Sequence, residues 1–344
     1  FPRIFEKNRW FFEYFVILLI ILSALVLTLP VSSNAGEVKI AELNWQSGSM
    51  LANIDAIIIE KGYGHDVEII PGGTEVTINS MLSNSTPDIF SEAWVNLLGA
   101  EANSAIDSGT LGLVTKDIIA GAGEGFYIPN YILEANPELT SFEAVLARPD
   151  LFPHPEDPSK GAMMICPGGW SCQNQHINLF TAFDMEAKGW KLLDPGSGAG
   201  MDSAWQGAVA KEQALFGYYW SPTALVGSLG IVKLAWDTPY AGDDNWQNCI
   251  AQPADTCSDP LATAMPIAET GTVVVPENLT KGVLLYLAKR KMPEGVTETM
   301  LVFGTENQSS AEDMAIEFLR LYPEVWERWV SSKAKENIWA TDGL

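Results

Sequence analysis

A short loop between two cysteines carries the residues best suited to binding chemistry in this sequence. It reads Cys166-Pro-Gly-Gly-Trp170-Ser171-Cys172, so one large aromatic ring lies beside two glycines. Glycine adopts positive φ angles that other residues resist, and such a loop can turn its backbone N–H groups toward one small concavity. The loop therefore offers an aromatic face and amide donors side by side, which predicts a ligand-binding role.

Two other interpretations of this loop stay open. If Cys166 and Cys172 pair, they close a ring of seven residues, for which the chain-entropy model gives only about 2 kcal/mol, so the bond would serve loop shape more than stability. The loop could also be a structural turn around a buried Trp170. A zinc site with His176 would have three of the four ligands that structural zinc requires.

Four tryptophans share one context in the expected secondary structure. Trp45, Trp94, Trp170 and Trp220 each follow the carboxyl end of an expected strand, the edge at which open α/β sheets bind ligands. Several aromatic faces around one point suit a quaternary ammonium ion, which has positive charge and methyl groups but no N–H donor. Each ring is worth about 0.5–2 kcal/mol, so three or four supply roughly 2–6 kcal/mol.

Enzyme and sugar-binding functions fit the same residues less well. The three histidines, His65, His154 and His176, lie in no recognisable catalytic motif, so no nucleophile with its base is evident. Sugars need several side-chain donors and acceptors beside each ring, whereas the neighbours of these tryptophans are mostly Gly, Pro, Ala and Tyr. We therefore expect a methylated ammonium ligand first, another small polar solute second, and an enzyme third, with no cofactor and no metal ion.

The Cys166–Cys172 loop, Trp94 and the downstream segment Tyr218-Tyr219-Trp220-Ser221-Pro222 together resemble the glycine betaine/proline betaine (quaternary amine) substrate-binding proteins of ABC transporters. The resemblance extends from about Val38 to the C-terminal region. It implies an α/β chain with a type II periplasmic-binding-protein fold, in which two α/β lobes hold the ligand in a cleft between them. It also implies a non-enzymatic protein that delivers its ligand to the permease subunits of an ABC importer.

The resemblance assigns roles to particular residues. Trp94, Trp170 and Trp220 match the aromatic cage of the family, and the backbone N–H groups of Ser171 and Cys172 match its grip on the ligand carboxylate. Trp45 is added to the cage from its own position after an expected strand.

One position departs from the family pattern. Some betaine-binding members have a histidine four residues after the first cage tryptophan, which also holds the carboxylate, and this chain has Leu98 there. We expect the trimethylammonium group to matter more than the carboxylate, as in glycine betaine, trimethylamine N-oxide or a similar osmolyte. Choline, a dimethylsulfonium compound or another small polar solute is the alternative. Glu42 and Glu92 are hypothetical counter-charges.

The elements that must hold these residues alternate between strand and helix, which predicts an α/β sheet of parallel strands. Ser47 or Ser49 is expected to cap the first helix and Gly62 to end it. Trp326 and Trp329, three residues apart, are expected to pack on the core. Expected strands are 38–43, 67–70, 88–90, 163–166, 215–219 and 272–275, and expected helices are 47–62, 97–108, 175–187, 279–291, 310–321 and a short one after Thr74, with a helical tail over 324–340.

The domain organisation follows from shifts in composition. Gly121, Gly123 and Gly125 begin a Pro-containing segment and are expected to mark a crossing between lobes. They do not form a dinucleotide-binding motif, because no crossover helix and acidic residue follow at the required distance. Residues 36–122 and 266–344 are predicted to form lobe I and residues 123–265 lobe II. The segment 237–260 is expected to be a long surface loop, without the regular ligand spacing of a calcium site.

The N-terminus has the layout of a secretory signal peptide over residues 1–35. Three basic residues precede an apolar run over 15–29, and Ser33-Asn34-Ala35 supplies a cleavage site after Ala35. Fifteen helical residues span about 22 Å, short of a bilayer core of about 30 Å, so an uncleaved anchor is the weaker alternative. Export to the periplasm would allow disulfides, with Cys249 and Cys257 as a second local pair.

Composition limits the partners. The chain has 344 residues, enough for two domains, and 20 Lys and Arg against 43 Asp and Glu give a net charge of −23. This charge argues against nucleic acid or an anionic membrane surface as partner and favours a soluble chain. We expect a monomer that binds a small molecule.

Overall fold

The computed structural model describes residues 35–341, and the predicted signal peptide up to Asn34 lies outside them. Of the described residues, 37–341 belong to one compact unit. No helix within residues 35–341 is long and apolar enough to cross a membrane.

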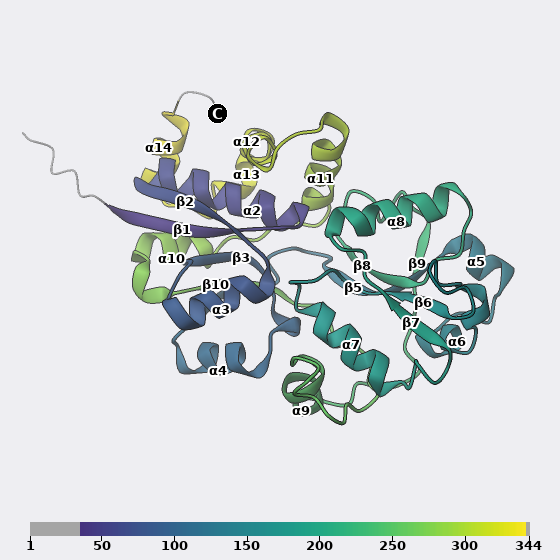
Figure 1. The fold of residues 1–344 in the computed structure, drawn as a ribbon. Helices are drawn as coiled ribbons and strands as arrows, with labels where there is room; N and C mark the ends of the chain where they lie inside the picture. The colour runs from purple at the N-terminus through teal and green to yellow at the C-terminus, as the bar shows by residue number, and fades with distance from the viewer. Residues whose placement is uncertain (1–34, 342–344) are drawn as a thin grey trace, which may run out of the picture. The chain divides into compact units, whose positions relative to one another are not determined.

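Two five-stranded sheets organise the chain, each with helices on both faces (Figure 1). The strand order of the first sheet is β2-β1-β3-β10-β4, and that of the second is β7-β6-β8-β5-β9. The strands are β1 (Ala35–Leu43), β2 (His65–Gly72), β3 (Ile89–Trp94), β4 (Gly112–Lys116), β5 (Gly123–Pro129), β6 (Gly161–Met164), β7 (Trp190–Leu193), β8 (Gly217–Ser221), β9 (Ile231–Lys233) and β10 (Thr270–Val274).

The prediction of purely parallel sheets is wrong. In the first sheet β1 and β3 are parallel, with Ile40 opposite Ile89, but β10 is antiparallel to both β3 and β4. In the second sheet β6 is parallel to β7 and β8, whereas β5 is antiparallel to β8 and β9. The two antiparallel strands, β5 and β10, are the first strands after the chain passes from one sheet to the other. No crossover helix within the same sheet precedes either strand, so neither has to run parallel to its neighbours.

The expected helices differ from the structure mainly at their ends, but α5, α6, α8 and α11 were not predicted from the sequence at all. In α11, Gly304 lies against Met314 of α12, so closely that a Cβ atom would collide with its side chain. The α-helices are α2 (Gln46–Ile57), α3 (Thr74–Asn84), α4 (Ala100–Ser108), α5 (Asn130–Ala135), α6 (Phe142–Leu146), α7 (Cys172–Ala182), α8 (Gly198–Ala210), α9 (Asp243–Asn245), α10 (Lys281–Leu287), α11 (Val296–Asn307), α12 (Ala311–Leu321), α13 (Pro323–Trp326) and α14 (Ser332–Trp339). Shorter 3-10 or π turns are η1 (Ile58–Gly62), η2 (Val95–Leu97), η3 (Pro149–Leu151), η4 (Trp246–Ile250) and η5 (Pro276–Asn278).

The serine cap predicted for α2 is wrong, whereas the helical run continues through η1 and ends at Gly62 as expected. Trp45 is the N-cap residue, and no side chain caps the helix. Ser47 and Ser49 instead donate hydrogen bonds to Glu92 and Glu42. The chain stays helical through Gly62, and the residue with positive φ is Gly64 (φ 76°). The predicted burial of Trp326 and Trp329 is confirmed, at 0% and 4% exposed.

A buried ion pair joins three elements of the first sheet. Arg290 and Asp55 are both fully buried, with 3.0 Å between Arg290 Nε and the Asp55 carboxylate. Arg290 Nη2 also donates to the Ser91 carbonyl on β3 and to Thr272 Oγ1 on β10, both at 2.7 Å. Because Arg290 turns inward here, α10 ends at Leu287 and the helix expected over 279–291 is too long. The pair fixes β3 immediately before Glu92.

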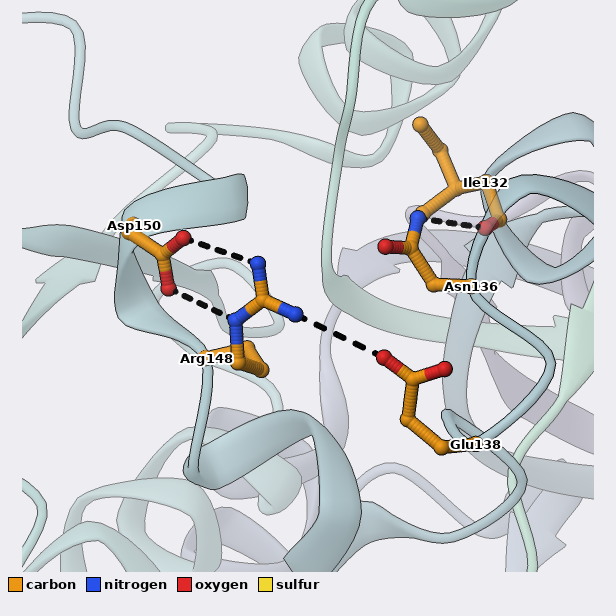
Figure 2. Close-up of polar contacts among 5 residues, drawn as sticks. All are labelled: Ile132, Asn136, Glu138, Arg148 and Asp150. Atoms are coloured by element: carbon orange, nitrogen blue, oxygen red, sulfur yellow. Dashed lines mark hydrogen bonds and ion pairs between the residues drawn. The ribbon is translucent and has the colours of Figure 1, made fainter.

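Beyond the second sheet, a surface arginine ties two loops together. Figure 2 shows Arg148 between Asp150, with two 2.9 Å bonds, and Glu138 at 3.5 Å. The same view shows the amide of Asn136 donating to the Ile132 carbonyl at 3.0 Å, which ends the turn after α5. These contacts hold parts of the Pro-containing segment together.

The segment 237–260 contains α9 and η4 and is not simply a loop. Asn178 on α7 donates to three of its carbonyls, those of Cys249, Ile250 and Gln252. The Sγ atoms of Cys249 and Cys257 lie at disulfide distance. Within residues 35–341, no group of three or more His, Cys, Asp or Glu residues is placed to hold a metal ion.

Candidate ligand-binding site

Two tryptophans from the first sheet and two from the second meet at one place. Trp45 is the N-cap residue of α2, Trp94 is the last residue of β3, Trp170 lies in the loop between β6 and α7, and Trp220 lies near the end of β8. All four are 6–8% exposed. The ring centroid of Trp170 is 5.5 Å from that of Trp45 and 5.1 Å from that of Trp220, and both contacts are edge to face.

A narrow cavity lies among these four rings. Its volume is about 20 Å³, enough for about one water molecule, so any larger group requires the rings to move apart. No charged side chain lines it. Its walls are Trp45, Thr74, Trp94, Leu97, Trp170, Ser171, Cys172, Tyr218 and Trp220.

The carboxylate of Glu92 sets the orientation of the first pair of indoles. Its Oε1 accepts hydrogen bonds from Trp45 Nε1 at 2.8 Å, Ser47 Oγ at 3.0 Å and Trp94 Nε1 at 3.1 Å. Glu92 is fully buried, and this burial raises its pKa to about 7 against the opposing effects of these bonds and of Arg290. Both indole N–H edges point at one carboxylate, so neither can donate to a ligand.

A hydrogen bond to a side chain next to the first sheet also orients Trp170. Its Nε1 donates to Oδ1 of Asn44, the residue after β1, at 2.7 Å. A second bond joins the same loop to α3, because the Glu75 amide donates to the Gly169 carbonyl at 3.3 Å. Gly169 has φ 87°, a conformation that favours glycine. The loop is thus shaped by its own glycine and attached to the first sheet's elements.

The helix after this loop starts earlier than expected, at Cys172 and not at 175. Ser171 already has helical angles (φ −56°, ψ −34°) and is the N-cap residue. The first amides of a helix have no intrahelical acceptor and carry partial positive charge. Ser171 and Cys172 therefore bring the amino end of α7 to the cavity wall.

The cysteines and His176 support this loop and do not form a metal site. The Sγ atoms of Cys166 and Cys172 lie at disulfide distance. The Nδ1 of His176 accepts a hydrogen bond from the Cys166 amide at 3.1 Å, and its complete burial lowers its pKa to about 3. The zinc interpretation is wrong, because the thiols are paired and the neutral ring already has a structural partner.

The remaining residues singled out from the sequence lie outside the cavity wall. Leu98 is buried and does not line the cavity. Glu42 accepts hydrogen bonds from Ser49 at 2.6 Å and Asn53 at 3.1 Å and also does not line it. Of the two hypothetical counter-charges, only Glu92 contacts the tryptophans.

Sequence reasoning missed the polar residues behind Trp220. Tyr218 stacks on Trp220, with centroids 6.3 Å apart and planes at 19°. Its hydroxyl donates to Glu124 at 2.8 Å, and Asn96 donates to the other oxygen of Glu124 at 2.6 Å. Burial raises the pKa of both Glu124 and Tyr218. Tyr218 stood within the motif quoted above, but its partners are distant in the sequence.

A second and larger cavity adjoins the first and shares Trp45 and Trp220 with it. Its volume is about 430 Å³, within the usual range for small-molecule sites. Of the described residues that line it, Asp202 on α8 is the one with a charged side chain. Nothing in the sequence pattern indicated this cavity, because its walls come from segments around residues 45, 200, 222 and 303.

Comparison with known proteins identifies the family. The sequence model of OpuAC, described as the substrate-binding domain of ABC-type glycine betaine transport systems, matches residues 36–320. The chain belongs to the OpuAC family. Members of this family are substrate-binding proteins of transporters and not enzymes. No curated protein sequence matches the chain.

Several solved structures share the fold at low sequence identity. A glycine betaine/L-proline-binding protein (ProX) from Borrelia burgdorferi is 16% identical, with a TM-score of 0.67 over 88% of this chain and 99% of that one. A choline-binding protein in complex with choline is 15% identical, with a TM-score of 0.69 over 88% and 97%. Lactococcal OpuAC, closed on glycine betaine, is 18% identical, with a TM-score of 0.62 over 86% and 100%. The predicted α/β periplasmic-binding-protein fold is confirmed, while the predicted lobe boundaries remain predictions.

Proposed function

We propose that this protein captures a methylated ammonium osmolyte, such as glycine betaine or trimethylamine N-oxide, among Trp45, Trp94, Trp170 and Trp220 and delivers it to the permease subunits of an ABC importer. Choline, a dimethylsulfonium compound or another small polar solute is the alternative ligand. The observation that carries the proposal is the bonding of two of these indoles to one buried carboxylate. The family match supports the transport role.

The chemistry of the cavity favours a cation without N–H groups. Four indole rings offer π electrons, and the nearest buried charge, Glu92, is negative. A carboxylate that accepts from an indole N–H increases the electron density of the ring, which strengthens its attraction for a cation on its face. The amides of Ser171 and Cys172 at the start of α7 suit an oxygen atom on the ligand.

Binding of this kind requires the two sheets to separate and close again. The rings now contact one another around a cavity of about 20 Å³. A ligand enters when Trp170 and Trp220, from the second sheet, move away from Trp45 and Trp94, and closure then removes the cation from water. Location in the periplasm and a monomeric state belong to this proposal, and two cysteine pairs at disulfide distance agree with an exported protein.

Calorimetric titration of residues 36–344 tests the proposal. We expect saturable binding of at least one of glycine betaine, trimethylamine N-oxide, choline and a dimethylsulfonium analogue, and none of maltose. A neutral tert-butyl analogue, in which carbon replaces nitrogen, should bind at least tenfold more weakly than its cation. Equal affinity for both would show a merely hydrophobic pocket, and binding of maltose alone would refute the proposal.

A further inference from the structure

The 430 Å³ cavity adjoins the proposed ammonium site and shares two wall side chains with it. Trp45 and Trp220 form part of the wall of both cavities. The amino end of α8 also lies against the site, since a Cβ atom on Gly198 would lie 3.3 Å from the Trp170 ring. Because the rings must move apart to admit an ammonium ion, a substituent on that ion would extend past Trp45 and Trp220 into the larger space.

The charge in this cavity comes from Asp202. Tyr219 donates a hydrogen bond to Asp202 Oδ1 at 2.8 Å, which fixes the side chain against β8. Among the hydrogen bonds of residues 35–341, this is the one that Asp202 accepts with its side chain, and it goes to Oδ1 and not to Oδ2. Burial raises the pKa of Asp202, and the hydrogen bond from Tyr219 opposes this only in part. Binding of a hydrogen-bond donor or a positive charge would relieve this cost.

A ligand carboxylate would meet the opposite environment. None of the residues lining either cavity is Lys, Arg or His. The first turn of α8 does present amides, but Ser197 Oγ already accepts from the Gly200 amide at 3.0 Å. Asp202 itself lies in the second turn of the same helix and offsets the positive end of its dipole. An anion here would be close to an unpaired carboxylate.

We infer that this cavity receives the polar substituent of the ammonium ligand, and that Asp202 selects a substituent that donates a hydrogen bond, such as a hydroxyl, over one that carries a carboxylate. This inference rests on the proposed function, since it places the ammonium group among the tryptophans. It narrows the substrate class from methylated ammonium compounds in general to hydroxyalkyl ammonium cations. Asp202 is thus a specificity-determining residue.

The test compares four ligands on wild type and Asp202→Asn by calorimetry. Tetramethylammonium probes the rings alone, choline adds a hydroxyl, n-propyltrimethylammonium replaces that hydroxyl by a methyl group, and glycine betaine adds a carboxylate. Asparagine preserves an acceptor for the Tyr219 hydroxyl and removes the charge. Asp107→Asn, a change of an exposed carboxylate on α4, is the matched control.

We expect wild type to bind choline at least tenfold more tightly than n-propyltrimethylammonium or glycine betaine, the effect of one hydrogen bond to a charged group. Asp202→Asn should reduce the ratio of choline to tetramethylammonium affinity about tenfold and improve the binding of glycine betaine, while Asp107→Asn leaves both unchanged. An unchanged ratio in Asp202→Asn would overturn the inference. So would equal wild-type affinities for choline and n-propyltrimethylammonium, a comparison that needs no variant. Loss of binding by all four cations and by trimethylamine N-oxide would instead refute the proposed function.

Discussion

Replacing Glu92 with glutamine tests whether a buried charge contributes to cation binding. The substitution retains an oxygen that can accept from Trp45 Nε1 and Trp94 Nε1, so the orientation of both rings should persist. It removes the negative charge. Because Glu92 is fully buried and one of its oxygens has no hydrogen-bond partner within the described residues, water screens this charge weakly.

The expected loss follows from the bonding geometry. The carboxylate lies 2.8 Å from Trp45 Nε1, so a cation on the ring face is about 7 Å away, and at an effective dielectric constant of about 20 the attraction is about 2 kcal/mol. Arg290 lowers the pKa of Glu92 and opposes part of this attraction. We expect a net loss of about 1–2 kcal/mol, or roughly fivefold to thirtyfold in affinity.

The dependence on pH has a definite sign. The pKa of Glu92 is raised from 4.5 to about 7, so the free protein carries this charge only above that pH. A bound cation favours the ionised form, and the affinity of wild type should therefore rise from pH 6 to pH 8 and then level off. Protonated Glu92 stabilises the folded state, because the pKa of this residue is higher in the folded protein than in the unfolded chain. Its contribution to the free energy of unfolding should therefore decrease as pH rises from about 4.5 through 7.

Titration calorimetry with tetramethylammonium, which does not titrate, measures both effects. Glu42→Gln is the control, because Glu42 also accepts two side-chain hydrogen bonds but does not line the cavity. Glu92→Gln should bind more weakly above pH 7 and lose the pH dependence, whereas Glu42→Gln should behave as wild type. Equal affinity of Glu92→Gln and wild type at pH 8 would refute the role of the charge.

Three further outcomes follow from the same site. Trp170→Ala should weaken binding of the cation by about 1.5–3 kcal/mol and Trp170→Phe by less, since a π face remains; titration that finds both equal to wild type would exclude Trp170 from the site. Asn44→Ala should reduce affinity about threefold to tenfold because the Trp170 N–H loses its acceptor, with Asn307→Ala as control, and a change in unfolding free energy without a change in affinity would limit Asn44 to a structural role. Thiol titration of the denatured, non-reduced protein should detect no free thiol, and four would argue against both cysteine pairs.

The parts of the site that local sequence could predict are those that depend on neighbouring residues. The position of each tryptophan near the end of a strand follows from the apolar run before it, and the turn at Gly169 follows from the glycines themselves. The shared acceptor of Trp45 and Trp94 could not be predicted in this way, because Glu92 and Trp45 are 47 residues apart. The bond from Trp170 to Asn44 crosses 126 residues.

Strand direction and the second cavity could not be predicted either, because both depend on how distant segments of the chain come together. Alternation of strands and helices indicates an α/β fold, but it does not show that β10 returns to the first sheet from the second without a crossover helix. Asp202 lies on a helix that no sequence motif distinguishes. Its carboxylate lines a cavity only because the fold brings Trp45 and Trp220 to the other walls of the same space. Such features depend on tertiary contacts that a single sequence does not display.

The hydrogen bond between Trp170 and Asn44 links the size of the ligand to the completeness of closure. The bond forms only when the second sheet's loop reaches the residue after β1, and the rings then leave little space. A compact trimethylammonium group lets the loop come back within reach of Asn44. A bulkier cation, such as a triethylammonium compound, would hold the loop away and leave this bond unmade. Under the proposed function, we expect such a compound to occupy the protein without restoring this closed arrangement and so to inhibit uptake without being transported.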